Sequence, residues 1–297
     1  MLQKGNPYLY VLPAVLFILI FFFGGLFQGL LQSFGITPYN KDLVFTTLAY
    51  QELLQSADFW QSLLLTFRVS FLSTMLSGLL GILFAFILFI MALKGYDSNT
   101  ASLFYRIFQY PLVIPHLAAG YLFLLLLMQS GWISRIGYHF GWVEEIHHFP
   151  ILVNDTFGWG MILTYTWKEA PFITLMIYPV LFRIHKSWYE VARLYGSNTR
   201  KFISNIAVPL ILPAWLSSLF IVFAFTFSAF EIPYLLGVTY PRLLPVYSFE
   251  LFTHGGWMER SQSLALNIIL AFITAILGGL SYKISKRWLL NERRGWE

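Results

Sequence analysis

Long apolar stretches alternate with short polar ones along the whole chain, a pattern typical of a protein that crosses a membrane several times. A helix needs about twenty mostly apolar residues to span a bilayer. Six stretches meet this requirement: Tyr8–Leu31, Leu63–Leu93, Phe108–Met128, Phe157–Ile184, Ile211–Leu236 and Leu264–Ile284. The sequence therefore predicts an all-α membrane protein with six transmembrane helices and both termini on the same side.

Basic residues predict which side that is, because loops on the cytoplasmic side of a membrane are enriched in Lys and Arg. The loops and ends that share a side with the termini hold thirteen basic residues, and the other side holds four. The thirteen are Lys4, Lys94, Arg106, Arg183, Lys186, Arg193, Arg200, Lys201, Lys283, Lys286, Arg287, Arg293 and Arg294; the four are Lys41, Arg135, Arg242 and Arg260. We therefore expect both termini, and the loop that follows the fourth span, to be cytoplasmic.

Composition supports a membrane protein and excludes several chemistries. Hydrophobic residues make up 58% of the chain and charged residues 11%, about half the charged share of a typical soluble domain. The absence of cysteine excludes disulfides, thiolate catalysis and cysteine metal sites. His147 and His148 lie beside Glu144 and Glu145, a grouping that suits either a weak metal site or, as we favour, a hydrated external loop.

The loop after the fourth span predicts two short helices separated by a glycine. Ser187 and Glu190 have the spacing of a capping box, which would start the first helix. Gly196 stands where a left-handed residue would end that helix, and Ser197 could cap the second. Pro209 and Pro213 would close or kink the second piece as the chain re-enters apolar sequence.

One face of the first of these helices is apolar. Trp188, Val191, Ala192 and Tyr195 follow the i, i+3, i+4, i+7 spacing that places side chains on one side of a helix. A membrane loop has too little sequence to bury such a face by itself, so we expect a protein partner to cover it.

This loop resembles the EAA loop of ABC-importer permeases, the membrane subunits of binding-protein-dependent uptake systems. The family pattern is Glu-Ala-Ala, three residues, Gly, nine residues, Ile, one residue, Leu-Pro. The chain has Glu190-Val191-Ala192, Gly196, Ile206 and Val208-Pro209 at this spacing, and departs only by Val for Ala and Val for Leu. The resemblance covers about residues 60–284.

The resemblance implies the MetI-like fold of type I ABC importer permeases and three segments. Residues 1–59 would form an N-terminal helix and external loop. Residues 60–284 would form the permease core with the coupling loop at 185–213, and residues 285–297 a cytoplasmic tail.

The resemblance also implies partners and a mode of action. The chain has no phosphate-binding loop, so it is not expected to be an enzyme or to bind a cofactor; ATP and Mg would bind to separate ABC ATPase subunits. A second permease, identical or different, an extracytoplasmic solute-binding protein and membrane lipid complete the expected partners in a bacterial inner membrane, with no nucleic acid. The residues assigned to ATPase coupling are Glu190, Val191, Ala192, Tyr195, Gly196, Ile206 and Pro209.

Charged residues inside predicted spans are costly and mark candidate pathway residues. Arg68 lies near the outer end of the second span, and Lys168 and Glu169 lie in the fourth, where one of them could pair with a charge on another span. Glu231 precedes Pro233, which predicts a broken helix. We take all five as candidates for the substrate pathway, with a structural pairing of Glu231 with Lys168 or Arg68 as the alternative.

The solute is predicted only weakly. Residues 228–237, with Tyr240-Pro241-Arg242 following, resemble permeases of polyamine and ferric-iron uptake, which favours a polyamine or similar small charged solute. A sugar permease is the alternative. A gradient-driven secondary transporter would need inverted repeats or a relay of charged residues, for which only Lys168, Glu169 and Glu231 are available.

Overall fold

The computed structural model describes residues 7–36, 45–93, 98–184 and 186–294, and all regular elements within these ranges are helices. The residues Lys4, Lys41 and Lys94, used above to predict orientation, lie outside them. The α-helices before the coupling loop are α1 (Pro7–Ser33), α2 (Leu48–Gln55), α3 (Ala57–Leu93), α4 (Ser98–Val113), α5 (His116–Leu127), α6 (Trp132–His139) and α7 (Trp159–Phe182). Those that follow are α8 (Lys186–Leu194), α9 (Thr199–Phe202), α10 (Val208–Ser228), α11 (Glu231–Leu236), α12 (Leu244–His254) and α13 (Trp257–Arg294), with a 3₁₀ turn at Ile146–His148 and a π turn at Ile203–Ala207.

Four of the six predicted spans each correspond to one helix, and each of the other two is broken into two helices. The first, second, fourth and sixth correspond to α1, α3, α7 and α13. The third span is not one helix, because the chain breaks at Ile114-Pro115 between α4 and α5. The fifth breaks at Ala229-Phe230 between α10 and α11. Within the described ranges, five helical segments are long and apolar enough to cross a membrane, and α7, which carries Lys168 and Glu169, is not among them.

The chain divides into two compact units, Met1–Trp60 with Leu244–Phe272, and Gln61–Leu243 with Ile273–Glu297. In the first unit, the hydroxyls of Ser248 and Ser263 lie 2.9 Å apart and join α12 to α13. The amide of Gln262 donates to the Glu52 carboxylate at 2.6 Å, which links α13 to α2. α13 also continues to Arg294, through most of the residues assigned above to a tail.

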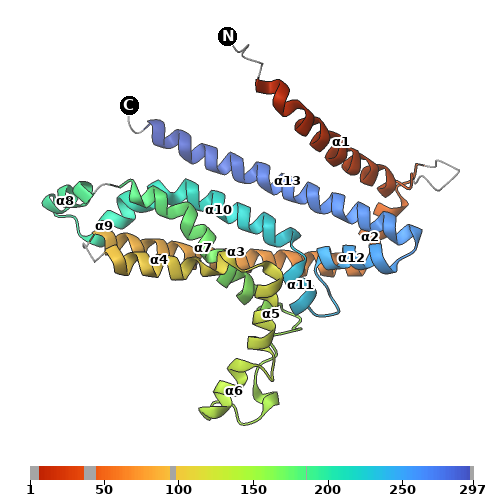
Figure 1. Ribbon diagram of the computed structural model, residues 1–297, viewed down its shortest axis with the longest axis horizontal. Coiled ribbons are helices and arrows are strands. Elements are labelled where there is room, and N and C mark those ends of the chain that lie inside the picture. The colour runs from red at the N-terminus through yellow and green to blue at the C-terminus, as the bar shows by residue number, and fades with distance from the viewer. Residues whose placement is uncertain (1–6, 37–44, 94–97, 185, 295–297) are drawn as a thin grey trace. The chain divides into compact units, whose positions relative to one another are not determined.

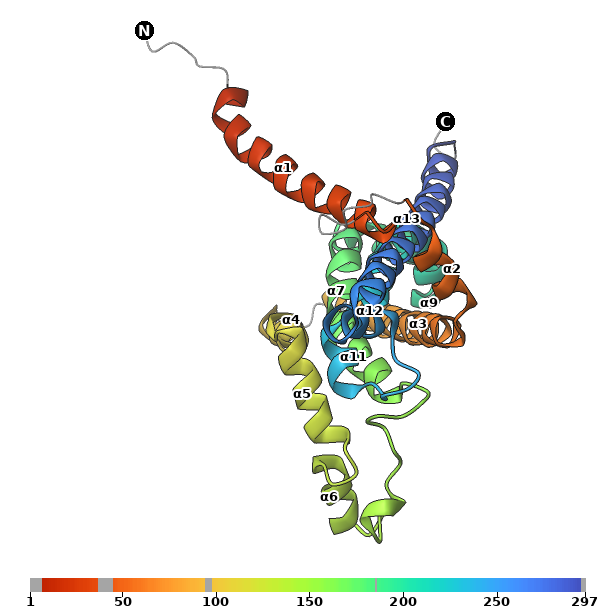
Figure 2. The ribbon, with the colours of Figure 1, turned by 90° about the vertical axis from the view of Figure 1, so that its right-hand side faces the viewer.

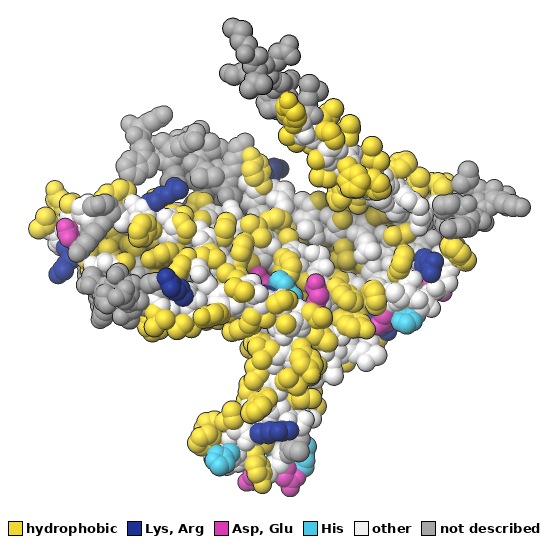
Figure 3. Space-filling view, in the orientation of Figure 1, with side chains coloured by type: hydrophobic (Ala, Val, Ile, Leu, Met, Phe, Trp, Pro, Cys, Tyr) yellow, Lys and Arg dark blue, Asp and Glu magenta, His cyan; other side chains and the backbone are white. Residues whose placement is uncertain are grey.

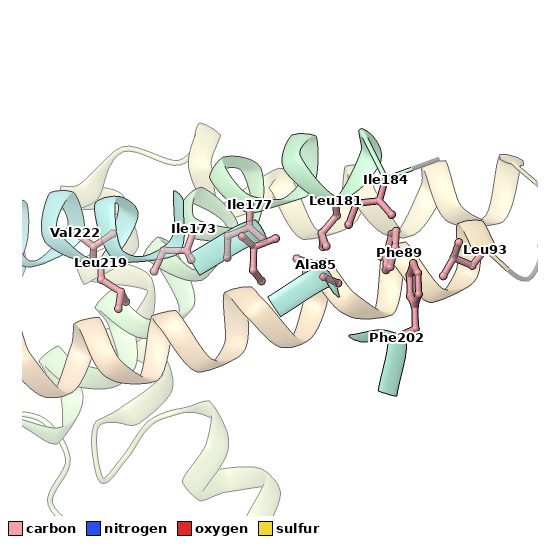
Figure 4. Packing of buried hydrophobic residues seen from close by; sticks show 12 residues of the cluster. Ala85, Phe89, Leu93, Ile173, Ile177, Leu181, Ile184, Phe202, Leu219 and Val222 are labelled. Carbon is pink, nitrogen blue, oxygen red and sulfur yellow. The ribbon is translucent and has the colours of Figure 1, made fainter. Parts of the chain in front are cut away.

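The second unit is built around α3, α4, α7 and α10, with α7 crossing the others at an oblique angle, and the segment of α5 and α6 projects from this group (Figures 1 and 2). Its largest apolar cluster joins α3, α7, α9 and α10 (Figure 4), with these buried residues: Ala85, Phe89, Leu93, Ile173, Ile177, Leu181, Ile184, Phe202, Ala207, Ile211, Leu219 and Val222. Apolar side chains also cover much of the exposed face seen in Figure 3, as expected of helices in contact with lipid.

Small residues allow the helices of this unit to approach closely. A Cβ on Gly78 would lie 2.4 Å from Leu219, and one on Gly81 would lie 2.8 Å from Ile173. The Thr174 hydroxyl donates to the Gly81 carbonyl at 3.0 Å, so α3 and α7 are in backbone-level contact. Glycine at these positions therefore sets the distance between the helices.

Candidate functional site

The end of α8 has the hydrogen-bond pattern of a glycine C-cap, the Schellman motif. Gly196 has a φ of 77°, as predicted. Its N–H donates to the carbonyl of Arg193 at 3.0 Å, and the N–H of Ser197 donates to the carbonyl of Ala192 at 3.0 Å. These bonds satisfy carbonyls that the helix end would otherwise leave free, and they fix the direction in which the chain leaves α8.

Two predicted caps are wrong. Ser187 lies inside α8, which already begins at Lys186, so it is not the N-cap residue of a capping box. Ser197 does not cap the next helix either. It belongs to the C-terminal motif of α8, and α9 has its N-cap one residue later. The Asn198 side chain accepts from the N–H of Lys201 at 2.8 Å and caps α9.

α8 has a packed side and a free side. Tyr189 and Ala192 pack against the apolar cluster; the Tyr189 hydroxyl lies 2.8 Å from that of Thr199, and its ring contacts Phe202 at 5.2 Å. On the free side Leu194 is 85% exposed and Tyr195 88%. Trp188 and Val191 are also exposed, so the predicted apolar face is open except for Ala192, while Leu194 was missed because it falls outside the i, i+3, i+4, i+7 series.

The second half of the loop continues into the membrane without a stop. Pro209 and Pro213 lie inside α10, where they do not end the helix. A π turn precedes them, in which the N–H of Val208 donates to the carbonyl of Ile203. Ile206 packs against the apolar cluster from this turn, and Pro209 is exposed. Proline has no N–H to donate to the preceding turn, and the wider hydrogen-bond spacing of the π turn is compatible with this missing donor.

Lys168 is 3% exposed and binds backbone rather than a carboxylate. Its ammonium group donates to the carbonyl of Pro111 at 2.8 Å and to that of Ile114 at 2.6 Å. Both carbonyls lie where α4 ends and the chain breaks. A positive charge at the C-terminal end of a helix is favourable, because the helix dipole is negative there.

Glu169 faces the other side of the same break. Its carboxylate lies 3.3 Å from Nε2 of His116, the first residue of α5, which is the positive end of that helix. The two side chains share a cavity of about 190 Å³ with Phe172, Ile221, Val222 and Phe225. The His116 ring contacts the Phe225 ring at 4.7 Å. One of the two α7 charges, Glu169, therefore lies at hydrogen-bonding distance from a side chain of another predicted span, that of His116.

Sequence reasoning missed His116. The available signal was its position directly after Pro115, because a polar residue that begins a helix beside a proline break lies at a free helix end. The sequence position of His116 indicates a free helix end only once the break at Pro115 is known.

Arg68 and Glu231 are not brought together. The Arg68 guanidinium donates to the carbonyl of Thr156 at 2.7 Å and lies 4.5 Å from the centre of the Phe157 ring. Glu231 is exposed as the first residue of α11, and Pro233 is buried in the first turn, where a missing N–H costs little. Within the described residues no hydrogen bond or ion pair joins Glu231 to Arg68 or Lys168, which contradicts the structural pairing considered above.

The segment between α5 and α7 forms a lobe around α6. It contains a cavity of about 590 Å³ lined by polar side chains that include Gln129, Arg135 and His147. His147 lies 3.0 Å from the Glu145 carboxylate, and both side chains are largely exposed. Charged side chains gather over this lobe and over α8 in Figure 3.

These features describe an all-helical protein with apolar helices long enough to cross a membrane and an exposed apolar face on α8. Residues 79–290 match the family of binding-protein-dependent transport system inner membrane components, and the chain belongs to that family of ABC transporter permeases.

Two relatives show the range of solutes among similar proteins. The glucose import system permease protein GlcT of Saccharolobus solfataricus is 25% identical over 97% of this chain and 99% of its own length. The molybdenum transport system permease protein ModB of Escherichia coli is 25% identical over 76% of this chain and 95% of its own length.

A solved structure confirms the fold. A bacterial ABC transporter involved in the import of the acidic polysaccharide alginate matches with a TM-score of 0.78 and 20% identity, and the match covers 94% of each chain. The predicted type of permease fold is therefore correct.

Proposed function

We propose that the chain is the sugar-conducting permease subunit of an ABC importer and forms half of the solute pathway. The observation that carries its coupling role is the exposed apolar side of α8, held at a defined angle by the Gly196 C-cap and by Tyr189. ATPase subunits would cover this side, and an extracytoplasmic binding protein would deliver the solute on the opposite face of a bacterial inner membrane. A second permease would supply the other half.

The coupling residues would divide into contacts and supports. Glu190, Val191 and Tyr195 are exposed and would contact the ATPase. Gly196 fixes the helix end, whereas Ala192 and Ile206 pack inward and transmit a push on α8 to the spans. Pro209 would keep the π turn in place at the start of α10.

A sugar is favoured over a polyamine for two reasons. One relative that aligns along nearly the whole chain, GlcT, is a glucose import permease. In addition, the side chains of Lys168 and Arg68 donate hydrogen bonds to backbone carbonyls, and the Glu169 carboxylate lies 3.3 Å from His116. The cavity beside Glu169 combines hydrogen-bonding groups with the rings of Phe172 and Phe225, a combination that suits a neutral polyhydroxylated solute.

An uptake panel tests this proposal. The chain would be expressed with its ATPase, partner permease and binding protein in cells that lack their own uptake systems. Labelled glucose, maltose, molybdate and spermidine would then be offered separately. We expect ATP-dependent accumulation of a sugar. Accumulation of spermidine or molybdate alone would overturn the proposed solute class and leave the permease assignment intact.

A topology test uses the absence of cysteine. With the α8 loop cytoplasmic, a cysteine at Ser197 should resist an impermeant thiol reagent in intact cells and react after permeabilisation. A cysteine at Ser56, before α3, should react in both conditions. The reverse labelling pattern would refute the proposed orientation.

Glu231→Gln tests whether α11 faces the solute. A hydrogen bond to a charged group contributes about 1.5–3 kcal/mol, so its loss should reduce labelled sugar uptake by at least about ten-fold per assembled complex. The yield of the complex should not change, because Glu231 is exposed. Glu144→Gln in the lobe around α6 is the matched control. Normal uptake by Glu231→Gln would show that the residue is only solvated.

A further inference from the structure

The sharp turn between α4 and α5 is created by Pro115 (Figure 2). In a continuous α-helix the carbonyl of Pro111 would accept from the N–H of residue 115. Residue 115 is proline and has no N–H, so this carbonyl loses its helical partner. Ile114, directly before the proline, presents a second carbonyl at the break. Unpaired backbone carbonyls at membrane depth are costly, because no water is present to bind them.

Lys168 supplies the donors that Pro115 removes. One ammonium group reaches both the Pro111 and the Ile114 carbonyls, at 2.8 and 2.6 Å, and it is buried among protein atoms rather than open to the cavity. The side chain of the next residue of α7, Glu169, contacts His116 in the first turn of α5. Neighbouring residues on a helix point about 100° apart, which allows adjacent side chains on α7 to reach the two helix ends separately.

The geometry points to Lys168 as a positioning residue of the solute pathway: with Glu169 it clamps the ends of the broken third span and fixes the direction of α5. His116, the first residue of α5, lines the cavity, so the clamp sets the position of a cavity wall without contacting solute itself. This inference rests on the proposed solute pathway but not on the class of solute that passes through it.

Spin-label distances in the full chain, reconstituted in lipid nanodiscs, test the clamp without any solute. Labels on cysteines at Leu103 in α4 and Tyr121 in α5, both exposed, report the direction of α5 relative to α4. We expect one narrow distance in the otherwise unchanged chain. Lys168→Met should broaden or shift it, and Lys168→Arg, which keeps several donors, should preserve it.

A second pair of variants isolates the role of Pro115. Pro115→Ala restores an N–H that can bind the Pro111 carbonyl, so Lys168→Met should have a smaller effect in this background than in the native one. Pro179→Ala in α7 is the matched control and should give no such relief.

An unchanged distance in Lys168→Met would overturn the inference. So would an equal effect of Lys168→Met with and without Pro115. If Lys168→Met cannot be purified, Glu169→Gln is measured instead, and it should broaden the same distance; an unchanged distance there would also overturn the clamp. Uptake of the solute that the uptake panel identifies should fall in Lys168→Met when it is normalised to assembled complex, whereas a residue that serves stability alone would lower only the yield.

Discussion

Gly196→Val is expected to abolish uptake while the chain still inserts into the membrane. Gly196 has a φ of 77°, a left-handed conformation that costs an L-residue roughly 1–2 kcal/mol and a β-branched residue more. No atom lies within 4 Å of a Cβ at this position, so backbone conformation rather than a clash is responsible. Valine should displace the end of α8 and its exposed face. Uptake of labelled glucose and co-purification of the ATPase would measure the effect.

Gly196→Asn provides the control for this variant. Asparagine adopts the left-handed conformation more readily than other non-glycine residues, so it should retain most of the uptake. If the valine and asparagine variants both transported normally, α8 would not be the coupling element.

Gly81→Val should produce the second large effect, a loss of folded protein. A Cβ at this position would lie 2.8 Å from Ile173 and 3.0 Å from the Ala170 carbonyl. Valine would separate α3 from α7 and disturb the hydrogen bond from Thr174. Overpacking typically costs about 1–3 kcal/mol, and more where backbone must move. The yield of monodisperse detergent-extracted protein and its unfolding temperature would fall.

The same substitution at Gly279 is the control. No atom lies within 4 Å of a Cβ there, so Gly279→Val should extract and unfold like the native chain. A Gly81→Val protein with native yield and unfolding temperature would refute the close approach of α3 and α7.

Hydropathy predicted where the helices are but not where they break. Proline alone is a poor guide, because Pro111, Pro171, Pro179 and Pro213 all lie inside helices. Pro115 ends a helix where Lys168, on a distant part of the chain, binds the freed carbonyls. That partnership depends on tertiary structure, which a pattern in one segment does not contain.

The local structure of the loop that carries α8 was predicted more accurately than the contacts of the pathway candidates, because that structure depends on neighbouring residues. Gly196 and the apolar spacing of α8 act through neighbours a few residues away. The N-cap of α9 is Asn198, one residue after the predicted Ser197. The pathway candidates depend instead on contacts between helices. The sequence therefore showed that a charged Glu169 inside a span is costly, but it did not identify His116 as its partner.

Lys168 also affects how the chain is assembled in the membrane. A charged residue at the centre of a helix costs about 2.5–3.5 kcal/mol during translocon-mediated insertion. The carbonyls that receive Lys168 precede it by 57 and 54 residues, so they leave the ribosome first. We therefore expect insertion of α7 to be favoured only after α4 is in the bilayer. Deleting the earlier helices should then leave α7 outside the membrane.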